Sequence, residues 1–284
     1  MIRCSDSIVR TVCSGLDHPE GLCLGADGTL FAGGEAGQIY QVDEPNGSAR
    51  QIADTGGFVL GMCADASGAV FACDAGRNEV LRIASGGEIE VVSSGSLDNP
   101  NDCALDPDGN LFFSESGNYR PDRPSGRLHA VARGGRSQCI HPGPLRFANG
   151  VFFDRRESLL YVVESTGPTV LAFRTDGAEL ADLEPVRTVV LKPDTVPDGV
   201  ALDIDGNLYV AFYCPDQIGV VRPDGTFEVL FRDHLAEWMN RPTNIALRRN
   251  EIVFANLGGW HLGSVSHPLE PVSPCYPRTG PRKP

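Results

Sequence analysis

The chain has 284 residues, 41% of them apolar, and a formal net charge of −13. That apolar content is enough for one large hydrophobic core or two ordinary ones. The negative charge argues against binding to nucleic acid or to an anionic membrane surface. No apolar run approaches the length of a membrane span, and the first residues lack the apolar segment of a signal peptide.

The cysteines follow no metal-binding pattern. There are nine of them, without a C-x-x-C pair and without zinc-like spacing to a histidine. An odd number of cysteines without a signal peptide is typical of reduced thiols. We therefore expect a cytoplasmic protein in which nearly all cysteines have structural roles.

The beginning of the chain predicts a sheet of short strands. Residues 8–12 read as a spare strand, and four more strands are expected at 21–24, 29–32, 38–42 and 48–52. Asp27-Gly28 supplies the hairpin between the first two of these four, because a two-residue turn of this kind needs positive φ. The 33 glycines, the 21 prolines and the lack of long helical periodicity also favour short strands and tight turns.

The same unit recurs along the chain. Its turn glycine returns as Gly28, Gly68, Gly109 and Gly206, with weaker copies of the turn at Glu157 and Asn250. Matching second strands are expected at 70–72, 111–113, 160–163, 208–210 and 252–255, and third strands at 79–83, 127–131, 169–173 and 218–221. A period of 40 to 49 residues with several strands is typical of propeller blades. The sequence thus predicts an all-β, six-bladed β-propeller with four antiparallel strands per blade.

The ends of the chain complete this prediction. We expect the N-terminal strand to pair with residues 262–265 of the last blade and so close the ring. Residues 1–284 are interpreted as a single domain, with a core at about 7–270 and a loose tail at 273–284 that is rich in Pro, Arg and Lys. Two stacked β-sandwiches are the rival architecture, but they do not account for six copies of one turn.

One position of the repeat carries oxygen-bearing side chains. Eight residues before the turn glycine, or at the matching place in the weaker copies, stand Glu20, Leu60, Asn101, Asn149, Asp198 and Thr243. In a propeller these six positions lie at the mouth of the central channel and face one another. Without a cation between them, two carboxylates at one mouth would repel each other, and the oxygens of two carboxamides would lack hydrogen-bond partners.

This inventory of oxygen atoms fits a hard divalent cation, which takes carboxylate, amide and water ligands. We expect one divalent metal ion, with calcium favoured. The alternative to a metal site is a purely structural role, in which Asn149 and Asp198, each followed by glycine, only form Asx turns at the starts of strands.

The repeat resembles the senescence-marker-protein/gluconolactonase family of six-bladed, metal-dependent lactonases, which includes regucalcin. The resemblance covers roughly residues 15–265 and is carried by Pro197-Asp198-Gly199 with Val200-Ala201-Leu202-Asp203, by Gly206-Asn207-Leu208-Tyr209-Val210, by Asn99-Pro100-Asn101-Asp102, by Ala148-Asn149-Gly150 and by Arg241-Pro242-Thr243-Asn244. It implies that Glu20, Asn149 and Asp198 hold the metal, and that Asn101 lies near the substrate. It also implies that magnesium, manganese or zinc can occupy the site in place of calcium.

The chain departs from the family at two places. Sugar-binding members carry an arginine two residues before the third-blade asparagine, where this chain has Asn99, and the first-blade motif here reads His18-Pro19-Glu20-Gly21. Specificity is expected from loops over the metal. The predicted substrate-binding residues are Asn99, Asn101, Tyr119, His18 and Trp260.

The predicted reaction is hydrolysis of a lactone, either sugar-type or another small cyclic ester. The metal polarises the carbonyl, Asp198 takes a proton from the attacking water, and Asn101 assists. Alternatives are a related esterase or phosphoester hydrolase, or a strictosidine-synthase-like or ligand-binding propeller with structural calcium. We expect a small-molecule partner, neither nucleic acid nor membrane, and a monomer or small homo-oligomer.

Overall fold

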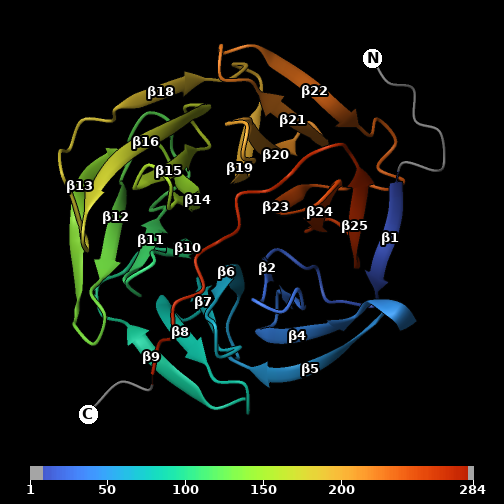
Figure 1. Cartoon of the computed structure of the whole chain (residues 1–284), viewed down its shortest axis with the longest axis horizontal. Coiled ribbons are helices and arrows are strands. Elements are labelled where there is room, and N and C mark those ends of the chain that lie inside the picture. The colour runs from blue at the N-terminus through green and yellow to red at the C-terminus, as the bar shows by residue number, and fades with distance from the viewer. Residues whose placement is uncertain (1–8, 281–284) are drawn as a thin grey trace.

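The computed structural model describes residues 9–280, and its regular elements are almost all β-strands. Six separate sheets stand around a central axis (Figure 1). Within the described range the only helical element is the short 3-10 helix η1, Glu44–Asn46. No helix of these residues is long and apolar enough to span a bilayer. The predicted six-bladed, all-β propeller is therefore confirmed.

Four blades use four consecutive strands, with the innermost strand first. Blade one consists of β2 (Leu22–Leu24), β3 (Leu30–Gly33), β4 (Gln38–Asp43) and β5 (Ser48–Asp54). Blade two consists of β6 (Val59–Ala64), β7 (Val70–Asp74), β8 (Glu79–Ile83) and β9 (Ile89–Ser93). Blade three consists of β10 (Pro100–Leu105), β11 (Leu111–Glu115), β12 (Gly126–Val131) and β13 (Ser137–Leu145).

The remaining blades follow the same plan with small changes. Blade four consists of β14 (Ala148–Asp154), β15 (Leu159–Glu164), β16 (Thr169–Asp176) and β18 (Arg187–Val190), with the short β17 (Glu179–Leu180) also paired to β16. Blade five consists of β19 (Val196–Leu202), β20 (Leu208–Cys214), β21 (Gln217–Val221) and β22 (Phe227–Arg232). Blade six takes β23 (Pro242–Arg248), β24 (Glu251–Asn256) and β25 (His261–Ser266) from the end of the chain and β1 (Val9–Ser14) from its beginning.

The repeated turn is built by side chains as well as by glycine. In blade five, Asp203 Oδ1 accepts the N–H groups of Asp205 and Asn207, and Asn207 Nδ2 donates to Asp203 Oδ2 at 2.7 Å. Gly206 takes φ +83°, a conformation that favours glycine. The D-x-D-G-N pattern therefore specifies a self-bonded turn between the first and second strand of the blade.

The core lies between neighbouring blades. Blades one and two, for example, pack Phe31 and Ile39 against Val70 and Leu81, and all four side chains are buried. Burial on both faces explains why the middle strands are nearly continuous runs of apolar residues.

The N-terminal strand closes the ring. β1 pairs antiparallel with β25, and Val9 lies opposite Val265. This confirms the predicted closure for residues 9–12, while Ile8 lies outside the described residues. Pairing the two ends of the chain in one blade leaves no gap in the ring (Figure 1).

The C-terminal segment differs from the predicted loose tail. It crosses the centre of the ring from blade five towards blade two (Figure 1). Val272 N donates to Leu202 O at 2.9 Å, Ala66 N donates to Pro277 O at 3.0 Å, and Thr279 bonds Asp65. Residues 273–280 are thus held against the end of the channel where the inner strands finish; residues 281–284 lie outside the described part.

Candidate active site

The other mouth of the channel, where the inner strands begin, contains a cavity of about 480 Å³. Five of the six repeat positions line it: Glu20, Leu60, Asn101, Asn149 and Asp198. The structure therefore brings together, from four blades, the residues that the sequence predicts as metal ligands and as catalytic groups. This convergence follows from the repeat, because equivalent positions on the inner strands face the same axis.

Glycines let the inner strands approach closely at this mouth. A Cβ at Gly150 would lie 2.4 Å from Asp198 O, and a Cβ at Gly21 would lie 2.1 Å from Leu60 O. Neither glycine has a positive φ. The Asn-Gly and Glu-Gly pairs are therefore explained by contact between blades, rather than by turns in which Asn149 and Asp198 would serve only as Asx residues.

Three oxygen atoms at the mouth are buried without a hydrogen-bond partner among the described residues. They are Asn101 Oδ1, Asn149 Oδ1 and Asp198 Oδ1. All three side chains are about 95% buried or more, with exposed fractions of 3%, 4% and 5% respectively. A buried polar atom without a partner costs about 1–3 kcal/mol, and three from three blades in one cavity indicate a site built to receive a ligand.

A hydrogen-bond chain orients one of these oxygens. Asn149 Nδ2 donates to Ser165 Oγ at 3.0 Å, and the Ser165 hydroxyl donates to Pro197 O at 2.7 Å. Because the amide nitrogen of Asn149 is engaged, its Oδ1 is the atom left for the cavity. Ser165, on the turn after β15, lines the cavity and was not predicted from the sequence.

Without a bound cation, the pKa values of the two carboxyl groups at the mouth are raised. Burial raises the pKa of Asp198 to about 7, opposed in part by a hydrogen bond from Asn149. Burial also raises the pKa of Glu20 well above its usual value, and the nearby Asp198 and Asp102 carboxylates add to this effect. Both shifts mean that negative charge at this mouth is unfavourable until a positive charge accompanies it.

Thr243, the sixth residue of the repeat position, is not part of the cavity lining. Its hydroxyl donates to Glu20 O at 3.0 Å, and Asn244 Nδ2 donates to the same carbonyl at 3.1 Å. These bonds tie blade six to blade one and fix the backbone of Glu20. Thr243 therefore has a positioning role here.

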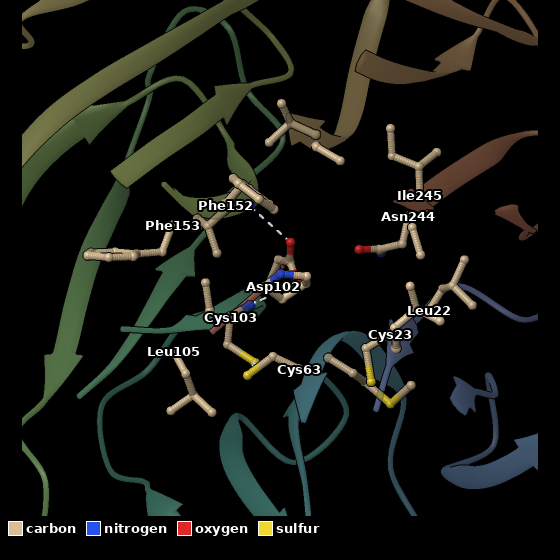
Figure 2. Close-up of a pocket in the computed structure, with 18 of the residues that line it drawn as sticks. Leu22, Cys23, Cys63, Asp102, Cys103, Leu105, Phe152, Phe153, Asn244 and Ile245 are labelled. Atoms are coloured by element: carbon tan, nitrogen blue, oxygen red, sulfur yellow. Dashed lines mark hydrogen bonds between the residues drawn. The ribbon is translucent and has the colours of Figure 1, made fainter. Parts of the chain in front are cut away.

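A third buried carboxyl group, Asp102, lies one residue below the mouth and was not singled out from the sequence. It faces the lower channel together with Asn244 from the opposite side (Figure 2). Its Oδ2 accepts Val151 N at 2.9 Å and its Oδ1 accepts Cys103 N at 2.8 Å. The sequence does contain a signal that marks this residue. Directly after the repeat position, blades one, two, four and five carry glycine, whereas blade three carries Asp102.

The outer part of the cavity has mostly apolar walls. Tyr119 and Phe147 lie there with ring centroids 4.9 Å apart in an edge-on arrangement. Asn99, which occupies the place of the family arginine, also lines the cavity. Three of the five residues predicted for substrate binding, Asn99, Asn101 and Tyr119, therefore lie in the same cavity as the predicted ligands.

His18 and Trp260, the other two predicted substrate residues, do not line the cavity. Their rings contact each other in a tilted arrangement with centroids 4.6 Å apart, and Trp260 is 59% exposed. His18 Nδ1 lies 3.1 Å from Asp17 Oδ1 and 3.3 Å from Glu35 Oε2. The rim between blades one and six thus contains a separate group of ionisable side chains, Asp17, His18 and Glu35.

Comparison with known proteins agrees with this architecture. The model of the family described as "SMP-30/Gluconolactonase/LRE-like region" matches residues 89–251, more than half of the chain. Lactonase drp35 of Staphylococcus haemolyticus (strain JCSC1435) is 25% identical over 163 residues, which cover 57% of this chain and 48% of that protein. The matched regions span less than half the length of the curated relatives.

Two solved structures share the fold over nearly the whole chain. The gluconolactonase XC5397 of Xanthomonas campestris has a TM-score of 0.74 and 21% identity, covering 92% of this chain and 89% of its own. A luciferin-regenerating enzyme has a TM-score of 0.77 and 16% identity, covering 95% and 99% respectively. Identity at this level supports the likeness of fold alone.

Proposed function

The chain belongs to the SMP-30/gluconolactonase/LRE-like family, and from this premise we propose that it is a divalent-metal-dependent hydrolase that opens a lactone. The observation that carries the proposal is the group of three buried, unpartnered oxygens on Asn101, Asn149 and Asp198 in one cavity. Lactonase drp35, to which the chain is similar, supports the reaction class.

The donor set fits a hard cation. Glu20, Asn149 and Asp198 offer two carboxylates and one amide oxygen, and no cysteine or histidine lines the cavity. Oxygen ligands of this kind suit calcium, and magnesium and manganese also accept them. When bound, the cation polarises the lactone carbonyl and stabilises the negative charge that develops on its oxygen.

Asp198 is proposed as the proton acceptor. Its Oδ1, which has no partner among the described residues, would bind the cation, and the second carboxylate oxygen would accept the proton of the attacking water. As the water oxygen bonds to the carbonyl carbon, the ring C–O bond breaks. The proton then passes from Asp198 to the departing alkoxide, which leaves a hydroxy acid as the product.

The neighbouring side chains orient the reacting groups. Asn101 is buried at the same mouth, where its amide N–H can donate to the substrate or to the attacking water. Asn149 is held by Ser165, and the backbone of Glu20 is held by Thr243 and Asn244. A rigid frame of this kind reduces the reorganisation needed in the transition state.

The proposal is tested by measuring hydrolysis of an unsubstituted six-membered lactone with protein stripped by a chelator and then reloaded. We expect activity to be lost on stripping and restored by calcium, magnesium or manganese. Calorimetry should find one cation per chain in the wild type and in the exposed control Asp205→Asn, and weaker binding in Glu20→Gln. Full activity in the stripped protein would contradict the metal-dependent mechanism.

A further inference from the structure

We propose that the lactone carries an uncharged, apolar substituent instead of the hydroxyl-rich or anionic groups of a sugar acid. This inference rests on the proposed lactonase function and concerns the outer part of the same cavity. The wall is formed mainly by apolar side chains. They are Phe58, Leu60, Phe147, Val196, Tyr213 and Leu257.

The aromatic wall is fixed in place by the backbone. Phe147 takes φ +60°, a left-handed conformation that is costly for a bulky residue. Its N–H donates to Leu145 O at 3.1 Å and its carbonyl accepts Ser165 N at 3.1 Å. These two hydrogen bonds fix the strained backbone conformation of Phe147. In this conformation the Phe147 ring lies against Tyr119 at the cavity wall.

The opposite wall is held in a similar way. Phe58 N donates to Asp74 Oδ1 at 2.9 Å, and Phe58 O accepts Ala75 N at 2.9 Å. Leu60 is the one apolar member of the repeat position among the residues that line the cavity. A preformed apolar surface of this kind favours ligands that bury carbon, because little ordering is needed on binding.

The charges at the cavity argue against an anionic substrate. None of its lining residues is a lysine, arginine or histidine, whereas Glu20 and Asp198 both line it. The guanidinium of Arg241 lies 4.9 Å from the ring centroid of Tyr213 and bonds the Tyr213 hydroxyl. This cation is therefore engaged with the wall, and a carboxylate or phosphate on the substrate would find no free counter-charge among the lining residues.

Two of the polar side chains on the wall already have hydrogen-bond partners. The Ser165 hydroxyl already donates to Pro197 O and accepts from Asn149, and the Tyr213 hydroxyl is bonded to Arg241. The cavity of about 480 Å³ is within the range that holds a drug-sized ligand, so it has room beyond a single lactone ring. That room is the space we assign to the apolar substituent.

The test is a series of δ-lactones with side chains of increasing length, compared with glucono-δ-lactone, on the metal-loaded enzyme. We expect kcat/KM to rise about four-fold for each added methylene until the wall is filled. Glucono-δ-lactone should be hydrolysed at least about ten-fold less efficiently than the unsubstituted ring.

Two substitutions by glycine distinguish the effect of losing the apolar wall from a general effect on folding. Phe147→Gly removes the ring and suits the positive φ, so we expect it to fold and to lower the preference for long-chain over unsubstituted lactone by about ten-fold. The matched control is Asn250→Gly, which also replaces a residue at positive φ, +59°, but in a turn of blade six outside the cavity lining. This control should leave the preference unchanged.

The outcomes distinguish the two proposals. Preference for glucono-δ-lactone over alkyl lactones, or a chain-length preference that Phe147→Gly does not change, would overturn the apolar substrate class while leaving the lactonase function intact. No hydrolysis of any lactone, including the unsubstituted ring, with any divalent cation would overturn the lactonase function and this inference with it.

Discussion

Two levels of the central channel, one residue apart along the inner strands, contain buried carboxyl groups in opposite states. At the upper mouth, Asp198 Oδ1 has no hydrogen-bond partner among residues 9–280, whereas one residue further down both oxygens of Asp102 accept backbone N–H groups. The lower cavity is lined by apolar and sulfur-bearing side chains such as Cys63 and Cys103 (Figure 2), and the C-terminal segment covers it. The comparison teaches that burial of a carboxyl group does not mark a site. Asp198 is distinguished because its unpartnered oxygen lines one cavity together with those of Asn101 and Asn149, whereas the unpartnered Oδ2 of the buried Asp74 lies outside that lining.

The largest effect is expected from Asp198→Asn at the upper mouth. The amide has nearly the same shape but cannot take a proton from water, so we expect kcat to fall by about 10²–10⁴-fold. The measurement is lactone hydrolysis with saturating calcium. At pH 8 a buried carboxylate without a cation destabilises the fold, and the substitution removes this charge. The melting temperature of the metal-free variant should therefore be no lower than that of the wild type.

The matched change is Asp205→Asn, in the exposed turn of the same blade. It should leave kcat within about two-fold, as is usual for surface substitutions. Equal activity of Asp198→Asn and Asp205→Asn would show that the unpartnered carboxyl group is not the proton acceptor.

The second prediction concerns the pH dependence of stability in the absence of a divalent cation. The pKa of Asp198 rises from its ordinary value of 3.8 to about 7 in the folded chain. Between these values the folded state binds more protons than the unfolded state, so this group makes the stability fall as pH rises from about 4 to about 7. Calcium should oppose the fall, because it favours the ionised form.

Scanning calorimetry at a series of pH values, with chelator or with calcium, measures this effect. The metal-free Asp198→Asn variant should lose less stability than the wild type between pH 5 and pH 8. An identical pH dependence of the two metal-free proteins would contradict the raised pKa of Asp198.

The fold was largely predictable because its signal is local. Gly206 at φ +83° and the Asp203 side chain that caps the same turn mark one blade, and similar turns mark the others. The repeat position that contains Asn149 and Asp198 follows from counting back from those turns. These features could be found from the sequence because each depends on residues that are close together in the chain.

The features that were missed depend on contacts between distant segments. The tail is held by Asp65 and Ala66 of blade two, and its sequence contains no sign of that partner. Asp102 fits only because the neighbouring blade has Gly61, where a Cβ would lie 1.9 Å from Asp102 Oδ1. The rim loop at Trp260 follows no repeat, so its position relative to the cavity could not be read from spacing.

The third prediction tests the lower end of the channel. Removal of residues 274–284 should destabilise the protein by about 2–4 kcal/mol, because it exposes the surface under Cys275 and removes the bonds made by Pro277 and Thr279. Denaturant unfolding measures the loss. The activity of the folded fraction should stay within about two-fold, since none of the described residues 274–280 lines the upper cavity.

Thr279→Val is the milder test of the same contact. It removes only the bond to Asp65 and should cost about 1 kcal/mol. A truncated protein with unchanged stability would show that the segment does not contribute to closing the channel.

The smallest effect is expected from Trp260→Ala at the rim. Trp260 is 59% exposed and does not line the cavity, so we expect kcat/KM to change by less than about three-fold. Tyr119→Ala, within the lining, should have a clearly larger effect on a long-chain lactone. A loss of ten-fold or more in Trp260→Ala would instead mean that the loop at His261 moves towards the cavity when substrate binds, which would restore the substrate-binding role predicted for Trp260 from the sequence.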